Sequence, residues 1–246
     1  MKKTLLMIAL VSAVAVANAQ DMMSKKGTPI LPESGDWSIG VSVNPFFDYF
    51  GNMFNGSTGN SSPSWDFTNS SQVITGKLMK DETTAYRAKV RLGFGSSSTE
   101  TGDTANGQLN KTSLSNMNVT LGAGLQMYRG KGRLQGFYGA EALIGFGSGK
   151  TTYDYNNGTT SAFAPTETNN GSTFNFGVRG FIGAEYFFAP KISISGEFGW
   201  GIGFSSTGAN ETTYGDGHVD TNVGKSSSFG LDTDNSGGSI NMSFYF

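Results

Sequence analysis

The stretch FNFGVRGFIGAEYFF, residues 174–188, decides the fold class of this chain. Apolar or small residues occupy every second position from Phe174 to Phe188, and the positions between them include Asn175, Arg179 and Glu185. Successive side chains of a β-strand point to opposite faces, so this period of two predicts a strand with one apolar face. The opposite face would carry glycine and charge.

The same alternation recurs along the chain. From Tyr86 to Phe94, for example, the apolar positions alternate with Arg87, Lys89 and Arg91. We predict eight strands on this basis: 36–47, 72–80, 85–96, 116–129, 134–150, 173–188, 191–205 and 237–246. Most reach the roughly 9–11 residues that a tilted strand needs to cross a membrane.

The connections between these strands alternate in length. Residues 81–84, 130–133 and 189–190 are tight turns, whereas 48–71, 97–115, 151–172 and 206–236 are long connections rich in Gly, Ser, Thr and Asn. Short turns at one end and long loops at the other are typical of outer-membrane β-barrels. We therefore predict an all-β fold, an eight-stranded antiparallel up-and-down transmembrane β-barrel over residues 36–246. Its even strand number would place both termini at the periplasmic end.

The composition fits this prediction. Glycine accounts for 36 of 246 residues, about twice the usual share of roughly 7%. After the N-terminal segment, no stretch approaches the length of unbroken apolar sequence that a membrane-spanning helix needs. The absence of cysteine excludes disulfides and thiolate metal sites.

The first 19 residues resemble a secretory signal peptide. Lys2 and Lys3 precede an apolar run that ends near Val16, and Ala17-Asn18-Ala19 is a small-x-small cleavage site. We expect cleavage between Ala19 and Gln20, and a short, flexible periplasmic lead over residues 20–35. Without Lys2 and Lys3, 15 of the 17 basic residues remain against 19 acidic ones, which argues against nucleic acid as a partner.

The apolar face decides between a membrane barrel and a soluble sheet. In hydrocarbon an open sheet edge would leave unpaired backbone groups, so the last strand, which ends on Phe246, has to pair with the first. A soluble sandwich or barrel is the alternative, but its apolar face would point inward. The face that carries glycine and charge suits the narrow interior of an eight-stranded barrel better.

These features together resemble the small outer-membrane β-barrel proteins of OmpA/OmpX-like fold, in particular single-domain members. The resemblance rests on the signal peptide, the rhythm of the connections and the ending INMSFYF, residues 240–246. It implies that Ile240, Met242, Phe244 and Phe246 form the C-terminal signal read by the barrel-assembly machinery. It also implies outer-membrane lipid as a partner and the outer membrane as the location. The fold hosts adhesins, structural barrels and a few enzymes, so the resemblance implies no particular activity.

The charged residues of the inward face are the candidate site. Counting residues from the short turns places Arg91, Glu141, Arg179 and Glu197 at similar depth, with Lys77, Arg87, Lys89 and Glu185 as a second group nearer the periplasm. Charges in such an interior must be paired or hydrated. We interpret them as a polar plug that fills the lumen; a small gated pore is the alternative.

Two further motifs are weak. His218, the only histidine, lies in the last long connection, and nothing in the sequence places it beside a serine as a catalytic base. The segment from Asp232 to Gly237 resembles the start of a calcium loop, but Ser243 stands where that loop requires glutamate. We therefore expect no enzyme activity, cofactor or metal. The long loops favour a structural or surface-interaction role with an external ligand, and a small porin-like or ligand-carrying transport barrel is the alternative.

Overall fold

The computed structural model describes residues 23–43, 74–103, 108–155, 162–222, 224–232 and 239–246. Within these ranges the regular structure is entirely β-strand. The strands are β1 (Trp37–Ser42), β2 (Ile74–Asp81), β3 (Thr84–Asp103), β4 (Gln108–Arg129), β5 (Leu134–Tyr155), β6 (Pro165–Ala189), β7 (Ile192–Thr207), β8 (Asn210–Tyr214), β9 (Val219–Asn222), β10 (Ser226–Asp232) and β11 (Ser239–Tyr245). In the described residues, no helix has the length and apolar character to cross a membrane.

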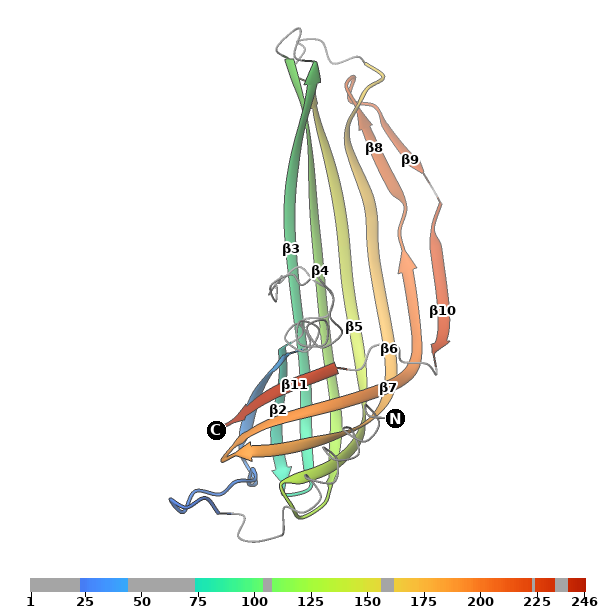
Figure 1. Ribbon diagram of the computed structural model, residues 1–246. Helices are drawn as coiled ribbons and strands as arrows, with labels where there is room; N and C mark the ends of the chain where they lie inside the picture. Colours follow the sequence, from blue (N-terminus) through green and yellow to red (C-terminus); the bar gives the residue numbers. More distant parts are fainter. Residues whose placement is uncertain (1–22, 44–73, 104–107, 156–161, 223, 233–238) are drawn as a thin grey trace, which may run out of the picture.

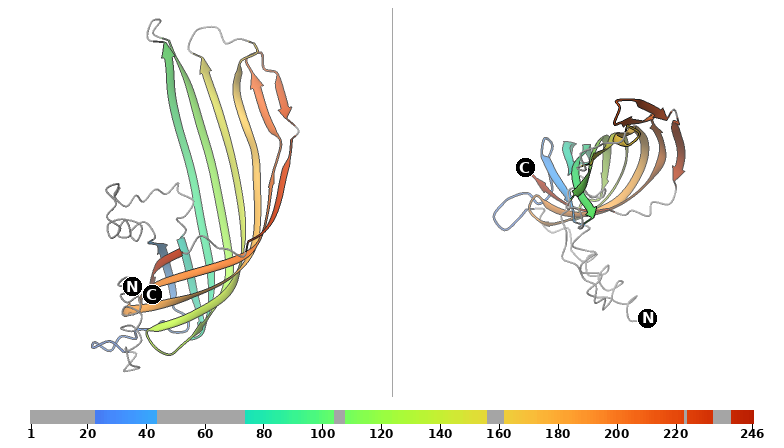
Figure 2. Two further views of the ribbon diagram at one scale, coloured as in Figure 1. Left: turned by 45° about the vertical axis from the view of Figure 1, so that its right-hand side comes forward. Right: turned by 90° about the horizontal axis from the view of Figure 1, so that it is seen from above.

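Eight of these strands close into a ring. β1 to β7 pair in chain order, and β11 lies between β7 and β1, so the sheet returns to its first strand. All of these pairings are antiparallel. Figure 1 shows β11 and β7 crossing in front of β2, and Figure 2 shows the same curved sheet from the side and from above. The predicted all-β, up-and-down ring of eight antiparallel strands is confirmed.

The pair that closes the ring joins the two ends of the domain. Ser38 lies opposite Tyr245, and Ser42 lies opposite Asn241. Beyond this ladder, the backbone N–H of Phe246 donates to the carbonyl of Trp37 at 2.8 Å, and the Trp37 N–H donates back at 3.2 Å. The two rings stack outside the barrel with centroids 4.9 Å apart. The last residue therefore completes the hydrogen-bonding of the sheet edge.

Three of the predicted long loops are largely strand, which corrects the sequence-based prediction. The segments predicted as loops at 97–115 and 151–172 extend β3, β4, β5 and β6 to between 20 and 25 residues each, and 206–236 contains β8, β9 and β10. These extensions are rich in Ser, Thr and Asn on both faces, so they lack the apolar alternation by which strands were recognised. Their backbone pairing continues regardless, as from Ser97 opposite Leu114 to Asp103 opposite Gln108. The predicted loop at 48–71 lies outside the described residues.

The extra strands widen the sheet away from the turns. β8 pairs with residues 165–169 of β6 and β9 pairs with β8, whereas β10 pairs with residues 201–207 of β7. β10 and β11 thus follow one another along the same edge of β7. Figures 1 and 2 show these strands rising with β3–β6 far beyond β1 and β2.

The outer face of the ring is apolar over a band of limited height. Large apolar side chains such as Leu92, Ile182 and Phe198 are about half exposed there. On five adjacent strands the band ends at the same kind of residue, an outward-facing serine directly after the last apolar position. These five serines, here called the serine line, are Ser96, Ser115, Ser148, Ser172 and Ser206. Below this line, the outward apolar positions reach at least the roughly 9–11 residues that a tilted membrane strand needs, as from Tyr86 to Phe94 on β3 and from Leu134 to Phe146 on β5.

Two of the short turns are stabilised by local hydrogen bonds or adopt an unusual backbone conformation. At the β2–β3 turn, Asp81 Oδ1 accepts hydrogen bonds from the backbone N–H and the hydroxyl of Thr83, both at 2.8 Å. These bonds from Thr83 stabilise the carboxylate and lower the pKa of Asp81 below its ordinary value of 3.8. The β6–β7 turn places Lys191 at a φ of 60°. In this left-handed conformation the backbone of Lys191 forms hydrogen bonds with two other segments of the chain.

The described part of the expected N-terminal lead, from Met23 onward, contacts the turn end of the barrel. The Lys191 N–H donates to the carbonyl of Ile30 at 3.1 Å, and the Gly35 N–H donates to the carbonyl of Met79 at 2.9 Å. Lys191 Nζ also bonds to the carboxylate of Asp36. The side chain of Ile30 is completely buried in the cluster of apolar residues at this end. Ile30, Gly35 and Asp36 thus attach this segment to the turn end of the ring.

Candidate functional site

The inward face of the ring carries the buried charge of the protein. Period-two alternation turns one set of side chains away from the apolar outer band, and the buried members of that set include lysine, arginine and glutamate. A charge removed from water is stable only when it is paired and hydrogen-bonded. Two groups of such pairs lie at successive levels of the interior.

The first group, here called the Arg87 cluster, consists of Arg87, Lys89, Glu141, Arg179 and Glu197. Glu141 accepts from Arg179 Nε at 2.5 Å and from Lys89 Nζ at 2.8 Å, and it lies 3.3 Å from Arg87 Nε. Glu197 bonds to both Arg87 and Arg179 and lies 3.7 Å from Lys89 Nζ. The two carboxylates thus share three cations across the interior.

Register explains why Arg87 reaches Glu141, two strands away. Arg87 lies opposite Gly124, and Gly124 lies opposite Glu141. A Cβ on Gly124 would come within 2.6 Å of the Glu141 Cβ, so only glycine leaves room for the contact. The same row continues through Arg179 to Gly201. One row of the sheet therefore reads Arg87, Gly124, Glu141, Arg179 and Gly201, with a glycine beside each end of the Glu141–Arg179 pair.

The second group, here called the Lys77 cluster, lies nearer the turns. Lys77 Nζ donates to Glu185 Oε2 at 2.7 Å, and the hydroxyls of Tyr128 and Tyr245 donate to the same carboxylate at 2.8 and 2.9 Å. Ser193 donates to Glu185 at 2.5 Å. Glu185 is completely buried, and four donors satisfy its two oxygens. The lysine ammonium is also surrounded by rings, with the centroids of Tyr128, Phe137 and Tyr245 at 5.7–5.9 Å.

Aromatic rings fill the interior between and below the two clusters. Phe137 and Phe181 meet edge to face with centroids 6.2 Å apart, and the Arg87 guanidinium lies 4.5 Å from the Phe181 ring. The alternation over residues 174–188 places Phe181 and Phe187 on the same face as Arg179 and Glu185. The sequence-based interpretation of this face nevertheless considered only its charge and glycine, and it did not predict that rings fill the interior. The rings of Phe181 and Phe187 are both buried.

The structure groups the predicted residues differently from the sequence. It brings Glu141, Arg179 and Glu197 together, but Arg87 and Lys89 belong with them and not with Lys77 and Glu185. Arg91 lies two positions beyond Lys89 on β3 and lines a hollow above the cluster. Residue counts from the turns failed here because neighbouring strands are staggered, so equal counts do not mean equal height.

The interior changes from filled to hollow at the Arg87 cluster. Between the two clusters, the space bordered by Lys77, Arg87 and Glu197 is about 10 Å³, close to the volume needed for one water. Above the Arg87 cluster lie adjoining hollows of about 470, 440 and 280 Å³. We call these hollows the vestibule.

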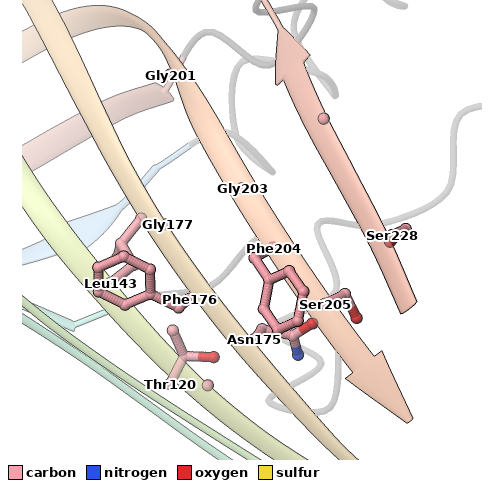
Figure 3. A pocket seen from close by; sticks show the side chains of 12 residues that line it. Thr120, Leu143, Asn175, Phe176, Gly177, Gly201, Gly203, Phe204, Ser205 and Ser228 are labelled. Atoms are coloured by element: carbon pink, nitrogen blue, oxygen red, sulfur yellow. The ribbon is translucent and has the colours of Figure 1, made fainter. Parts of the chain in front are cut away.

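Glycine creates the vestibule. The row directly above the cluster reads Lys89, Gly122, Leu143, Gly177, Gly203 and Gly230 from β3 to β10. The next row reads Arg91, Thr120, Gly145, Asn175, Ser205 and Ser228. Figure 3 shows the wall formed by these strands, with the side chains of Thr120, Asn175, Ser205 and Ser228 at its second row. Small side chains on facing strands leave a hollow large enough for a small molecule.

The remaining candidates of the sequence lie away from this interior. His218 is in the exposed turn between β8 and β9, where its Nε2 is 2.9 Å from Asp220 Oδ1. In the described part of the chain, no group of three or more His, Cys, Asp or Glu side chains is placed to hold a metal ion. Asp232 ends β10, and the rest of the calcium-like segment lies outside the described residues, as do Ala19 and Gln20 of the expected cleavage site.

The residues of the expected assembly signal occupy alternate positions at the C-terminus. Phe244 and Phe246 are exposed, whereas Tyr245 between them and Ser243 before Phe244 are buried in the interior. Ile240 and Met242 precede Phe244 on the same face by the register of β11 with β7 and β1. The pattern of the signal is therefore also the alternation of the closing strand.

Comparison with known proteins finds similarity among solved structures. No protein-family model matches the chain, and no curated protein matches it. Among solved structures, the chain is similar to the outer membrane protein OprG from Pseudomonas aeruginosa, with a TM-score of 0.38 and 10% identity over 88% of this chain and 98% of that one.

Proposed function

We propose that the protein is an integral outer-membrane β-barrel that closes its lumen with the two ion clusters and presents a projecting β-sheet to the exterior. The observation that carries the proposal is the contrast between the outer and inner faces of one closed ring. Apolar side chains are exposed on the outside, and buried ion pairs lie on the inside. In a soluble barrel these faces would be reversed.

The membrane location follows from the outer band. Exposed apolar surface of this extent is unfavourable in water, and it marks contact with lipid or another apolar partner. The serine line gives the band a sharp upper limit, with Phe94, Phe146, Phe174 and Phe204 immediately below it. Aromatic residues settle at membrane interfaces. We infer that the turns and both termini are periplasmic, after removal of the signal peptide between Ala19 and Gln20 and insertion by the barrel-assembly machinery.

The strands above the serine line support the proposed surface role. Seven residues of each of β3 to β6 continue beyond it, to Asp103, Gln108, Tyr155 and Pro165 respectively. At a rise of about 3.3 Å per residue, this sheet would stand roughly 20 Å above the membrane. We propose that it is the surface that meets an external ligand, in place of four loops.

Two measurements test this function. Outer-membrane fractions should contain a band that migrates faster in unboiled than in boiled samples, because a closed barrel stays compact in cold detergent. The purified protein should give no stable openings in planar bilayers, because the space between the clusters is too narrow for a hydrated ion. Recovery in the soluble fraction would contradict the membrane location, and large stable openings would contradict the plug.

A transport barrel is the second candidate. The observation in its favour is the vestibule, which would bring a solute as far as the Arg87 cluster. Solute-dependent conductance, raised in an Arg87→Ala variant, would support this candidate over a closed barrel.

A further inference from the structure

We propose that the floor of the vestibule binds a small organic anion, a hydroxylated molecule that carries a phosphate or carboxylate group. The proposal goes beyond the role of the barrel as a closed anchor, and it does not depend on whether the lumen conducts.

The charge lining the vestibule has a single sign. Among the described residues that border its three hollows, the charged side chains are those of Arg91 and Arg179, and none is an aspartate or a glutamate. A concave wall with charge of one sign attracts ligands of the opposite sign. An anion entering the vestibule would meet arginines and no carboxylate.

The Arg87 cluster below adds to this positive field. It contains three cations and two carboxylates, so its pairs do not balance. The side chains of Glu141 and Glu197 are only 1% and 3% exposed, whereas those of Arg179 and Lys89 are 22% and 15% exposed. The carboxylates are therefore covered, and the accessible part of the cluster is cationic.

Arg179 has the geometry to serve a ligand as well as the cluster. A guanidinium carries five N–H donors. Its Nε bonds to Glu141 and its Nη2 to Glu197, while its Nη1 lies against Gly199, which itself borders the vestibule. The two carboxylates fix the guanidinium in place, so a third partner would bind to a pre-organised donor.

Neutral polar groups line the vestibule above this point. Thr120 and Asn175 border the hollow that shares Gly177, Gly201 and Gly203 with the hollow of Arg179. Asn116, Asn118 and Thr173 border the next hollow, together with Arg91, and the Oδ1 atom of Asn118 is buried there without a hydrogen-bond partner. Amide and hydroxyl groups match the hydroxyls of a polyol or sugar body, and the glycine row beneath them leaves space for it.

The experiment is a titration of the purified full-length barrel, in a non-ionic detergent, with three probes of similar size. Glucose 6-phosphate and gluconate carry the anionic group, and glucose is the neutral control. We expect at least one anionic probe to bind at least about tenfold more tightly than glucose by calorimetry. Binding should weaken about fivefold between low and roughly 0.5 M salt because screening reduces the attraction. The tighter anion identifies phosphate or carboxylate as the preferred group.

Two variants test the location of the site. Arg179→Gln should reduce binding of the tighter anion at least about tenfold, but it also removes two ion pairs that support the barrel. Gly203→Leu avoids this problem, because a Cβ there has nothing closer than a carbonyl oxygen at 4.0 Å and the side chain would enter the vestibule. It should weaken binding to a similar degree while the unboiled protein still migrates as a compact barrel.

Matched controls lie on the same strand as Gly203 and on the strand next to that of Arg179. Gly196→Leu adds the same side chain to β7 on the outer face, where a Cβ meets nothing within 4 Å, and Lys150→Gln removes an exposed cation paired with Glu167 at 2.7 Å. Both should bind like the parent. Equal binding of all three probes, or no binding of either anion to the compact barrel, would overturn the proposal. Unchanged binding in compact Gly203→Leu would overturn its location.

Discussion

The two halves of the barrel interior use glycine in opposite ways. In the half near the turns, glycine makes room for large side chains, and a Cβ on Gly139 would lie 2.6 Å from the Phe181 ring and 2.0 Å from a backbone oxygen. In the half beyond the Arg87 cluster, glycine lies opposite glycine, and Gly203 and Gly230 face open space. The difference teaches that glycine content alone predicts neither a pore nor a plug. What matters is whether the facing positions carry large side chains.

Removing a buried charge from the filled half should have the largest effect on the free energy of unfolding, and it tests whether this half is tightly packed. Glu185→Ala leaves the Lys77 ammonium among aromatic rings without its carboxylate, and breaking such a pair costs about 3–5 kcal/mol. Denaturant titration in detergent micelles measures the change. The double variant Lys77→Met, Glu185→Leu should recover most of the loss, because no unpaired charge remains.

The exposed pair above the membrane gives the control. Glu167→Gln breaks the Lys150–Glu167 pair and should cost no more than about 1 kcal/mol. Equal effects of Glu185→Ala and Glu167→Gln would show that the Lys77 cluster contributes no more than a surface pair.

The next effect tests the height of the apolar band. Leu121 faces outward in the middle of the band on β4, and Ser115 belongs to the serine line on the same strand. Leu121→Arg should destabilise the barrel in lipid bilayers by about 2–4 kcal/mol, and Ser115→Arg by about 0–1 kcal/mol. Unfolding in liposomes measures both. A larger cost at Ser115 would place the membrane surface above the serine line.

A smaller effect compares the two kinds of glycine directly. Gly139→Ala forces a Cβ against backbone and ring, and overpacking of this kind costs about 1–3 kcal/mol. Gly203→Ala adds a methyl group to open space and should change the free energy of unfolding by less than about 0.5 kcal/mol. Similar costs for the two variants would mean that both halves are equally packed.

The smallest effect lies outside the membrane, at the turn. Because the folded-state pKa of Asp81 is lowered, its carboxylate contributes stability above the unfolded-state pKa and loses it as the pH falls through the folded-state pKa. Asp81→Ala should therefore lower the unfolding midpoint at neutral pH, and the difference from the parent should narrow below about pH 4. A difference that persists at low pH would mean that the bonds from Thr83 do not depend on the charge.

The sequence predicted the ring because the membrane imposes its own pattern on the strands. Predicted strand starts at 85, 134 and 191 lie within one residue of β3, β5 and β7, since the apolar band marks one face of each. Above the serine line both faces meet polar surroundings, so the alternation disappears while the backbone ladder continues. That is why residues 97–103 and 165–172 looked like loops.

The charged residues were predictable from parity, but their partners were not. Alternation identifies Arg87, Glu141 and Arg179 as inward-facing. Their pairing depends on register, which places Gly124 between Arg87 and Glu141, and register follows from the stagger of the whole barrel. The rings of Phe137 and Phe181 were missed because the inward face was expected to be polar.

The closing pair has a consequence for how this protein reaches its folded state. β1 and β11 are more than 200 residues apart in the chain. Their ladder therefore joins the two strands of the ring that are farthest apart in the sequence. Such contacts form late, because the entropy of closing the intervening chain is lost before they contribute. Until this ladder forms, both edges of the sheet stay open to pairing with other strands.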